Sequence, residues 1–214
     1  GSTVDATESS GPHTKGSPMT TTTATATTTA ATIPETSKAP ARWKLDASHT
    51  SVSFSVRHMM ITNVRGEFQK LDGDVVFDPR QPDASKVRAS IETASVSTRE
   101  EKRDAHLRSA DFFDAENHPA MTFESRRVRK TSGGYEILGD LTIRGTTRPV
   151  TLAVSDVTAE HVDPWGQRRI GAAATTTIRR SEFGMTWNTA LEAGGLLVGD
   201  EVKIHVEASL VKQA

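Results

Sequence analysis

The stretch TSVSFSVRHM, residues 50–59, alternates apolar and polar side chains with a period of two. Val52, Phe54 and Val56 share one face with His58, whereas serines and Arg57 make up the opposite face. This alternation predicts a β-strand that buries one face and exposes the other to solvent.

Further segments along the chain repeat the same pattern, and polar turn sequences separate several of them. These segments are DVVFD (74–78), KVRASIETAS (86–95), AMTFES (120–125), YEILGDLTIRG (135–145), PVTLAVSDV (149–157), RRIGAAATTTIRR (168–180) and EVKIHVEASLVK (201–212). The predicted turns lie at Asp72–Gly73, Ser132–Gly134, Arg144–Pro149 and Asp163–Gln167. Because short connections join antiparallel neighbours, the pattern predicts an all-β protein with about eight antiparallel strands.

Strands with one apolar face must hide that face, either in a sandwich or in a closed barrel. A barrel of about eight strands has an interior that holds packed side chains or one small ligand. The inward faces include the small residues Ala89, Gly139, Ala172 and Ala174, which leave room inside. We therefore expect an eight-stranded antiparallel barrel that holds a ligand, with a close-packed sheet structure as the alternative.

One segment of the chain has helical rather than strand character. Thr98 and Glu101 have the spacing of a capping box, and the following EEKRDAHLRS has high helix propensity. We expect one helix at about residues 99–113 that flanks or caps the barrel. Arg103 and Asp104 are expected to form an ion pair between this helix and the barrel.

The N-terminal part of the chain has a different composition, with TTTTATATTT at residues 20–29 and almost no large apolar residue before residue 41. We expect a disordered tail at residues 1–40, with a vector-derived opening and Met19 as the natural start, and one domain at residues 41–214. No secretory signal follows Met19, so a cytoplasmic protein is expected, unless a signal was removed before cloning. No apolar run approaches the roughly 18 residues that span a bilayer.

Charge and cysteine content exclude several classes of function. The chain has no cysteine, which excludes disulfides, cysteine nucleophiles and cysteine metal sites. Its 26 basic and 27 acidic residues are dispersed. Nucleic-acid binding requires a basic surface, so we expect no nucleic-acid partner.

Long blocks of the sequence resemble the YceI family, in the order that the family shows. The blocks are WKLDASHTSVSFSVRHMMITNVRGEF (43–68), STREEKRDAHLRSADFFDAENHPAMTFES (97–125), GDLTIRGTTRPVTL (139–152), RSEFGMTWN (180–188) and GGLLVGDEVKIHVE (194–207). The resemblance implies a lipocalin-like eight-stranded barrel with a flanking helix. It implies binding of a long amphiphilic lipid, chiefly a polyisoprenoid such as an isoprenoid quinone and in some members a fatty-acid-derived lipid, in a family for which no catalytic activity is established. Many relatives are periplasmic and dimeric, so a homodimer is a further expectation.

A lipid tail needs an apolar tunnel with few polar groups at its mouth. We predict that the inward strand faces and the aromatic residues around the helix supply the wall. The predicted ligand-binding residues are Phe54, Val56, His58, Ile91, Phe112, Phe113, Met121, Phe123, Leu141, Ile143 and Trp187. The alternative is that many of these residues belong to an ordinary packed core.

His58 is the histidine of most interest because its position in the alternation turns it inward. It could donate a hydrogen bond to a lipid head group, although a structural bond to a backbone carbonyl is the favoured interpretation. Asp104 and His106 lie two positions apart on the predicted helix, so they point about 200° apart and are not expected to share a metal. The arginines considered as pyrophosphate ligands, with solvated charges as the favoured alternative, are Arg57, Arg144, Arg179 and Arg180.

Three functions remain open from the sequence. The first is a lipid carrier or reservoir, with the bound lipid as ligand and with no cofactor or metal. The second is an isomerase or hydrolase that acts on such a lipid through His58 and a nearby carboxylate. The third is an interaction module with a packed barrel. We rank them in this order because no motif with catalytic spacing, such as G-x-S-x-G or H-E-x-x-H, is present.

Overall fold

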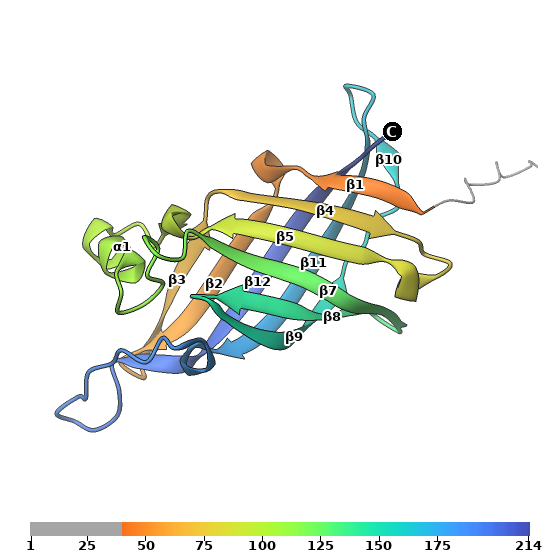
Figure 1. Cartoon of the computed structure of the whole chain (residues 1–214). Helices are drawn as coiled ribbons and strands as arrows, with labels where there is room; N and C mark the ends of the chain where they lie inside the picture. The colour runs from red at the N-terminus through yellow and green to blue at the C-terminus, as the bar shows by residue number, and fades with distance from the viewer. Residues whose placement is uncertain (1–39) are drawn as a thin grey trace, which may run out of the picture. The chain divides into compact units, whose positions relative to one another are not determined.

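The computed structural model describes residues 40–214, so the tail predicted at residues 1–40 lies outside the described part apart from Pro40. These residues form a β-sheet protein with one α-helix (Figure 1). The strands are β1 (Ala41–Leu45), β2 (Ser51–His58), β3 (Thr62–Phe68), β4 (Leu71–Phe77), β5 (Lys86–Glu92), β6 (Val96–Ser97), β7 (Ala120–Thr131), β8 (Gly134–Ile143), β9 (Thr146–Ser155), β10 (His161–Val162), β11 (Arg168–Arg179) and β12 (Val198–Lys212). The helix is α1 (Glu101–Arg108), and the 3₁₀ turns are η1 (Ala47–His49), η2 (Pro82–Ala84), η3 (Thr93–Ser95) and η4 (Arg180–Phe183).

The sheet closes on itself because β11 pairs with β9 on one edge and with β12 on the other. The closed ring runs β11, β9, β8, β7, β5, β4, β1 and β12, and each pair in it is antiparallel. The predicted eight-stranded antiparallel barrel with one helix is therefore confirmed.

Three of the barrel strands are each broken into two elements. The first broken strand consists of β1 and β2, which both pair with β12. The second consists of β3, which pairs with β2, and β4, which pairs with β1. The third consists of β5, which pairs with β4, and β6, which pairs with β3. The breaks fall at η1, at Gln69–Lys70 and at η3. Each broken pair therefore acts as one bent strand, which the sequence pattern alone did not show.

One predicted turn was wrong. Asp72 and Gly73 lie inside β4, where they pair with Ser90 and Ala89 of β5. Gly73 is not needed for a turn, but a Cβ on it would come within 2.9 Å of the Arg88 carbonyl oxygen. The glycine therefore permits a close approach of two strands, which is a common reason for glycine within a sheet.

The helix is shorter than predicted, and its cap is a different residue. The Glu100 carboxylate accepts hydrogen bonds from the backbone N–H groups of Lys102 and Arg103, at 3.2 and 2.7 Å. Thr98 instead donates its backbone N–H and its hydroxyl to the buried Asp104 carboxylate. The N-terminal turn thus contains the expected residue types, but the capping box predicted for Thr98 is not formed.

The expected ion pair between Arg103 and Asp104 is also replaced by bonds to Thr98. Arg103 Nε donates to Thr98 Oγ1 at 2.7 Å, and its Nη2 donates to the Thr98 carbonyl at 3.0 Å. Both charged residues therefore hold the end of β6 against α1.

Two groups of buried apolar residues occupy the two ends of the barrel. The first includes Trp43, Ile170 and Leu210, near the C-terminal end of β12. The second lies towards α1 and consists of Phe68, Val96, Met121, Ile143, Ile178, Phe183 and Met185. We call the end that carries α1, the β2–β3 turn and the loop at residues 184–197 the α1 end, and the opposite end, with β10, the far end (Figure 1).

An ion triad stabilises the far end. Arg169 Nη1 lies 2.6 Å from Asp46 Oδ2, and its Nε lies 2.6 Å from Asp163 Oδ2. The Arg169 guanidinium is the main cause that lowers the pKa of both carboxyl groups below the ordinary value. This contact joins the segment between β1 and β2 to the turn between β10 and β11.

Candidate functional site

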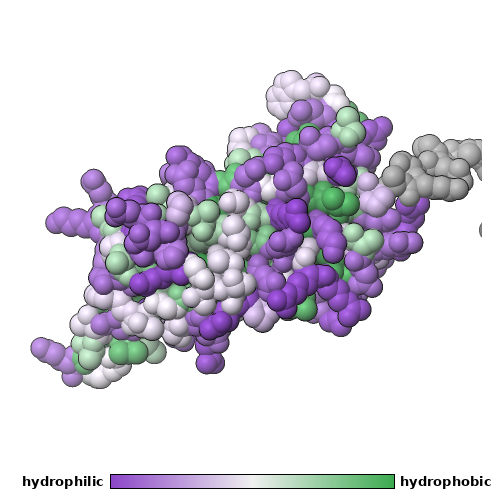
Figure 2. Space-filling view, in the orientation of Figure 1, coloured by the Kyte–Doolittle hydropathy of each residue, from purple (hydrophilic) through white to green (hydrophobic). Residues whose placement is uncertain are grey.

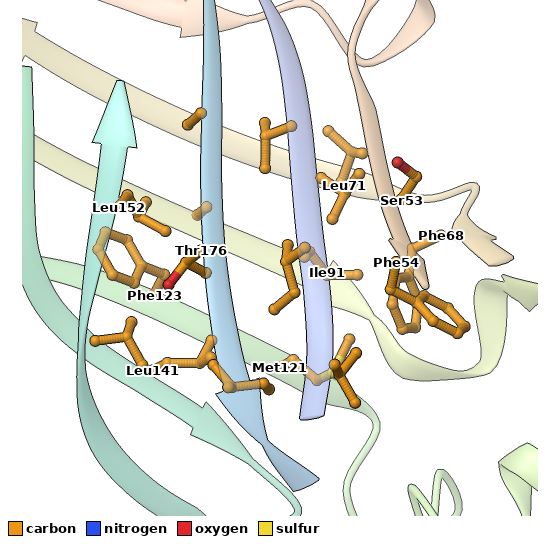
Figure 3. A pocket seen from close by; sticks show the side chains of 18 of the residues that line it. Ser53, Phe54, Phe68, Leu71, Ile91, Met121, Phe123, Leu141, Leu152 and Thr176 are labelled. Atoms are coloured by element: carbon orange, nitrogen blue, oxygen red, sulfur yellow. The ribbon is translucent and has the colours of Figure 1, made fainter. Parts of the chain in front are cut away.

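The barrel interior contains a cavity of about 620 Å³. It extends from Ile170 and Leu210 towards the far end to His106 and Trp187 at the α1 end. Apolar side chains from strands on opposite sides of the barrel converge on it (Figure 3). The alternation predicted from the sequence explains this wall, since the inward residues of each strand line the cavity.

The structure brings all of the predicted ligand-binding residues into the wall of this one cavity. The residues are Phe54, Val56, His58, Ile91, Phe112, Phe113, Met121, Phe123, Leu141, Ile143 and Trp187. They come from four different strands, from the segment after α1 and from the loop after η4. Their contact with a lipid stays a prediction.

Several lining residues were missed by the sequence analysis. Phe68 packs against Phe54 with 5.7 Å between ring centroids, and the two rings lie together in Figure 3. Val64, which lies four residues before Phe68 on the same face of β3, also lines the cavity. The alternation in NVRGEF (residues 63–68) places Val64 and Phe68 on one face. This segment has few large apolar residues, so its strand signal is weak. The α1 residue Leu107 also lines the cavity, and only the packing of the helix reveals that.

The small inward residues do not all enlarge the cavity. Ala89, Ala172 and Ala174 line it, as predicted. At Gly139, however, a Cβ would lie 2.4 Å from Cζ of Phe123. The Phe123 ring therefore fills the space above Gly139, and this glycine serves packing rather than cavity volume.

An aromatic cluster closes around the α1 end of the cavity. The imidazole of His106 stands edge-on to Trp187, with 4.7 Å between ring centroids, and edge-on to Phe112, at 5.0 Å. Phe112 and Trp187 are 5.4 Å apart. His106 Nε2 also lies 2.9 Å from the Asp111 carboxylate, which fixes the orientation of the ring. The helix and the loop after η4 thus meet through this cluster.

Arg180 differs most from its predicted role as a solvated charge, because it is only 6% exposed. Its Nε and Nη2 donate to the carbonyls of Gly199 and Val198, at 2.8 and 3.2 Å. Its Nη1 donates to the carbonyls of Met185 and Trp187, at 2.6 and 2.9 Å. The guanidinium therefore ties both ends of the loop at residues 184–197 to the barrel.

Burial lowers the pKa of Arg180, although the charge of Asp200 opposes this shift. Arg180 also lines the cavity, and its guanidinium carbon lies 5.9 Å from the centre of the Phe112 ring. The guanidinium is held by neutral carbonyls and forms no salt bridge within the described residues, although the negative charge of Asp200 acts on it.

The other arginines considered as pyrophosphate ligands have different surroundings. Arg144 Nη1 donates to the carbonyls of Phe112 and Gly184, at 3.2 and 3.1 Å. Arg57 Nε donates to the Met60 carbonyl at 3.3 Å, and Arg179 is exposed. The structure therefore assigns backbone-bracing contacts to three of the four arginines.

The lining side chains that carry nitrogen gather at the α1 end, whereas the oxygen-bearing Ser53, Asp72, Ser85, Tyr135 and Thr176 lie elsewhere in the wall. His58, Lys102, Arg103, His106 and Arg180 all line the cavity at the α1 end. Each carries a nitrogen that can donate a hydrogen bond. Lys102 and Arg103 are also exposed, so the cavity wall beside α1 includes surface residues, as it does at Val157 at the far end.

His58 lines the cavity as predicted, but the expected bond to a backbone carbonyl is not observed. Within residues 40–214 its imidazole has no hydrogen-bond partner. No group of three or more potential metal-binding side chains occurs among the described residues. None of the helices in the described part is long and apolar enough to cross a membrane.

Comparison with known protein families agrees with this geometry. The family model for the YceI-like domain matches residues 43–210. The chain belongs to the YceI family. A UPF0312 protein of Ectopseudomonas mendocina is 42% identical over 139 residues, which are 64% of this chain and 72% of that protein. A UPF0312 protein of Yersinia pestis is 38% identical over 152 residues, which are 70% of this chain and 79% of that protein.

Solved structures with the same fold include other YceI proteins. BcnA of Burkholderia cenocepacia superposes with a TM-score of 0.68 at 25% identity and covers 77% of this YceI chain and 98% of its own. The YCEI protein of Campylobacter jejuni gives 0.62 at 28% identity, over 74% and 90% of the two chains. A polyisoprenoid binding domain from Saccharophagus degradans gives 0.58 at 14% identity, over 80% and 98%, which shows the shared fold.

Proposed function

We propose that this YceI domain is a non-enzymatic carrier or reservoir that binds one long-chain isoprenoid lipid inside the barrel. The observation that carries the proposal is the internal cavity of about 620 Å³, whose wall is apolar along the strands and carries donor nitrogens at the α1 end. A long apolar tail with a small polar head matches both parts of this wall.

The apolar wall can supply the binding free energy. Burial of apolar surface contributes about 25 cal/mol per Å², so a tail that buries about 400 Å² gains roughly 10 kcal/mol before the losses of association. An isoprenoid tail needs no hydrogen bonds, and the strand part of the wall offers few. Met121, in the wall towards the α1 end, has a flexible side chain that can adapt to a branched chain.

The donor nitrogens at the α1 end favour a head group that accepts hydrogen bonds. The His58 imidazole has no hydrogen-bond partner among the described residues, and the Arg180 guanidinium also lines the cavity. A quinone carbonyl or another acceptor oxygen at this end would satisfy the imidazole. We therefore propose that the tail lies along the barrel and that the head group lies at the α1 end of the cavity.

The relatives support the proposal without deciding the ligand. One neighbour of the same fold is a polyisoprenoid binding domain, although its 14% identity shows only the fold. The match to the YceI-like domain and this neighbour favour a binding protein over an enzyme.

The proposal is tested by titrating the protein with an isoprenoid quinone and, in parallel, with the same quinone ring without its tail. Quenching of Trp187 fluorescence reports occupancy, because this indole lines the cavity. We expect saturable binding of one long-tailed quinone per chain and no measurable binding of the ring alone. Equal binding of both compounds, or binding of neither, would contradict a lipid site built on the tail.

A further inference from the structure

Four exposed apolar side chains lie together at the α1 end. Met59, Met60 and Ile61 form the β2–β3 turn and are 43%, 59% and 71% exposed. Leu196, in the loop after η4, is 51% exposed. We call these four residues the tip patch. Both segments project at the lower left of Figure 1, and apolar surface is visible there in Figure 2.

The two segments of the tip patch are joined to each other. The Met59 backbone N–H donates to the Leu197 carbonyl at 2.8 Å. A Cβ on Gly195 would lie 3.5 Å from Cγ of Met60, so the two loops lie close together at this point. The four residues therefore form one surface rather than two separate exposed loops.

The backbone holds the methionines in an unusual conformation. Met59 and Met60 have φ values of 51° and 61°, in the left-handed region that non-glycine residues seldom adopt. Such residues cost stability and persist where surrounding contacts enforce them, often at functional sites. Arg57 Nε, which donates to the Met60 carbonyl at 3.3 Å, is one such contact.

The tip patch is continuous with the cavity wall. His58 precedes Met59 in the chain and lines the cavity, and Leu197 follows Leu196 and lines it too. A ligand that leaves the cavity beside α1 therefore meets this apolar surface at once. The continuity argues that whatever covers the tip patch also receives or supplies the lipid.

We propose that the tip patch inserts into the surface of a phospholipid bilayer when lipid enters or leaves the barrel. This inference rests on the proposed lipid-binding function. A bilayer suits the patch because the patch projects outward and consists mainly of adaptable methionine, isoleucine and leucine side chains. The exposed cations Arg57 and Lys102 on the same end are offset by the exposed carboxylates of Glu100, Glu101 and Glu192, so the apolar side chains rather than charge carry the inference.

The test is co-sedimentation with vesicles made of phosphatidylcholine and phosphatidylglycerol. The tip variant carries Met60→Asn, Ile61→Ser and Leu196→Ser, because asparagine tolerates the left-handed backbone at position 60. The control variant carries Val162→Ser and Trp165→Ser, which remove exposed apolar side chains at the far end, 60% and 80% exposed. We expect the tip variant to bind vesicles at least roughly ten-fold more weakly than the wild type, and the control to bind like the wild type.

Two results would overturn the proposal. One is a wild-type protein that does not sediment with vesicles. If this protein instead forms a dimer that the tip variant breaks, the patch joins two copies of the chain and does not contact a bilayer. The other is equal vesicle binding by the wild type and the tip variant. Titration of each protein with isoprenoid quinone delivered from ethanol is measured separately. A wild type that does not bind this quinone would contradict the proposed function. Vesicle binding tests only whether the tip patch contacts the bilayer.

Discussion

The phenyl ring of Phe113 stands edge-on to the ring of Phe68, with 5.6 Å between ring centroids and an interplanar angle of 77°. Its neighbour Phe112 turns to a different partner and lies 5.4 Å from Trp187. The two adjacent phenylalanines after α1 thus join the helix segment to β3 on one side and to the loop after η4 on the other. These contacts explain why two aromatic residues follow the charged helix α1.

Truncation of the two rings is expected to have unequal effects on stability. Phe112 is buried, so Phe112→Ala should lower the free energy of unfolding by about 3–5 kcal/mol. Phe113 is only half-buried, so Phe113→Ala should lower it by a smaller amount. Urea-induced unfolding followed by circular dichroism measures both values. A Phe112→Ala protein as stable as the wild type would show that the helix segment is not anchored by this ring.

Filling the cavity from within should abolish lipid binding while the fold is kept. Ala174 lines the cavity in the middle of β11, whereas the next residue, Thr175, is exposed on the outer face. Ala174→Phe is expected to weaken binding of a long-tailed quinone by at least about ten-fold, which corresponds to roughly 1.4 kcal/mol. Thr175→Phe, which adds the same ring outside, should bind like the wild type. If both variants bind equally well, the lipid does not occupy the barrel.

Arg180 is expected to be essential to the loop at residues 184–197. Arg180→Ala removes the guanidinium donor from four carbonyls, of which that of Val198 keeps the Asn188 side-chain amide as a donor at 2.7 Å. Unpaired buried acceptors cost about 1–3 kcal/mol each before relaxation. We expect a loss of about 3 kcal/mol or more in the free energy of unfolding, together with faster proteolysis within the loop. The neighbouring exposed Arg179 is the control, and Arg179→Ala should change stability by no more than about 0.5 kcal/mol.

Arg180→Lys separates charge from geometry. Lysine keeps the positive charge, but one ammonium group cannot reproduce the fork that binds four carbonyls. We therefore expect most of the instability of Arg180→Ala to persist in Arg180→Lys. Full rescue by lysine in urea unfolding would mean that the charge alone matters at this position.

The ion triad at the far end predicts a loss of stability in acid. The Arg169 guanidinium lowers the pKa of Asp46 and Asp163 in the folded state. A lowered pKa contributes stability that is present above the unfolded value of about 4 and is lost as pH falls through the folded values. The difference in thermal stability between the wild type and Asp163→Asn should thus be large at pH 7 and shrink below about pH 4.

The control for this pH dependence is an exposed ion pair. Asp83 lies 3.3 Å from Arg127, and both side chains are largely solvated. Asp83→Asn should have little effect at any pH, since exposed pairs contribute little to stability. A wild-type protein whose advantage over Asp163→Asn is independent of pH would show that the triad does not stabilise through its charges.

The barrel and the composition of its wall could be predicted because both depend on local alternation. Ala172 and Ala174 of β11 and Val206 of β12 turn inward, as their positions in the pattern predict. A period of two fixes the face of each residue once the strand exists. The eleven predicted wall residues follow from the same rule and from the family resemblance.

The remaining features depend on contacts between distant parts of the chain. Nothing near Arg180 in the sequence indicates that carbonyls up to Gly199 surround it, so a buried role was not foreseen. Gly73 has the local sequence of a turn, but pairing with β5 decides its place. Thr98 has the spacing of a helix cap, yet Asp104 engages it from within the helix. In each case a long-range or competing hydrogen bond outweighed a local preference.

The most direct test of the account is native mass spectrometry of the freshly purified protein, combined with mass spectrometry of its organic extract. We predict one isoprenoid lipid per chain, retained by the wild type and by Thr175→Phe and strongly reduced in Ala174→Phe. A wild-type protein that is empty when purified and takes up no added isoprenoid quinone would contradict the central claim that the barrel binds such a lipid.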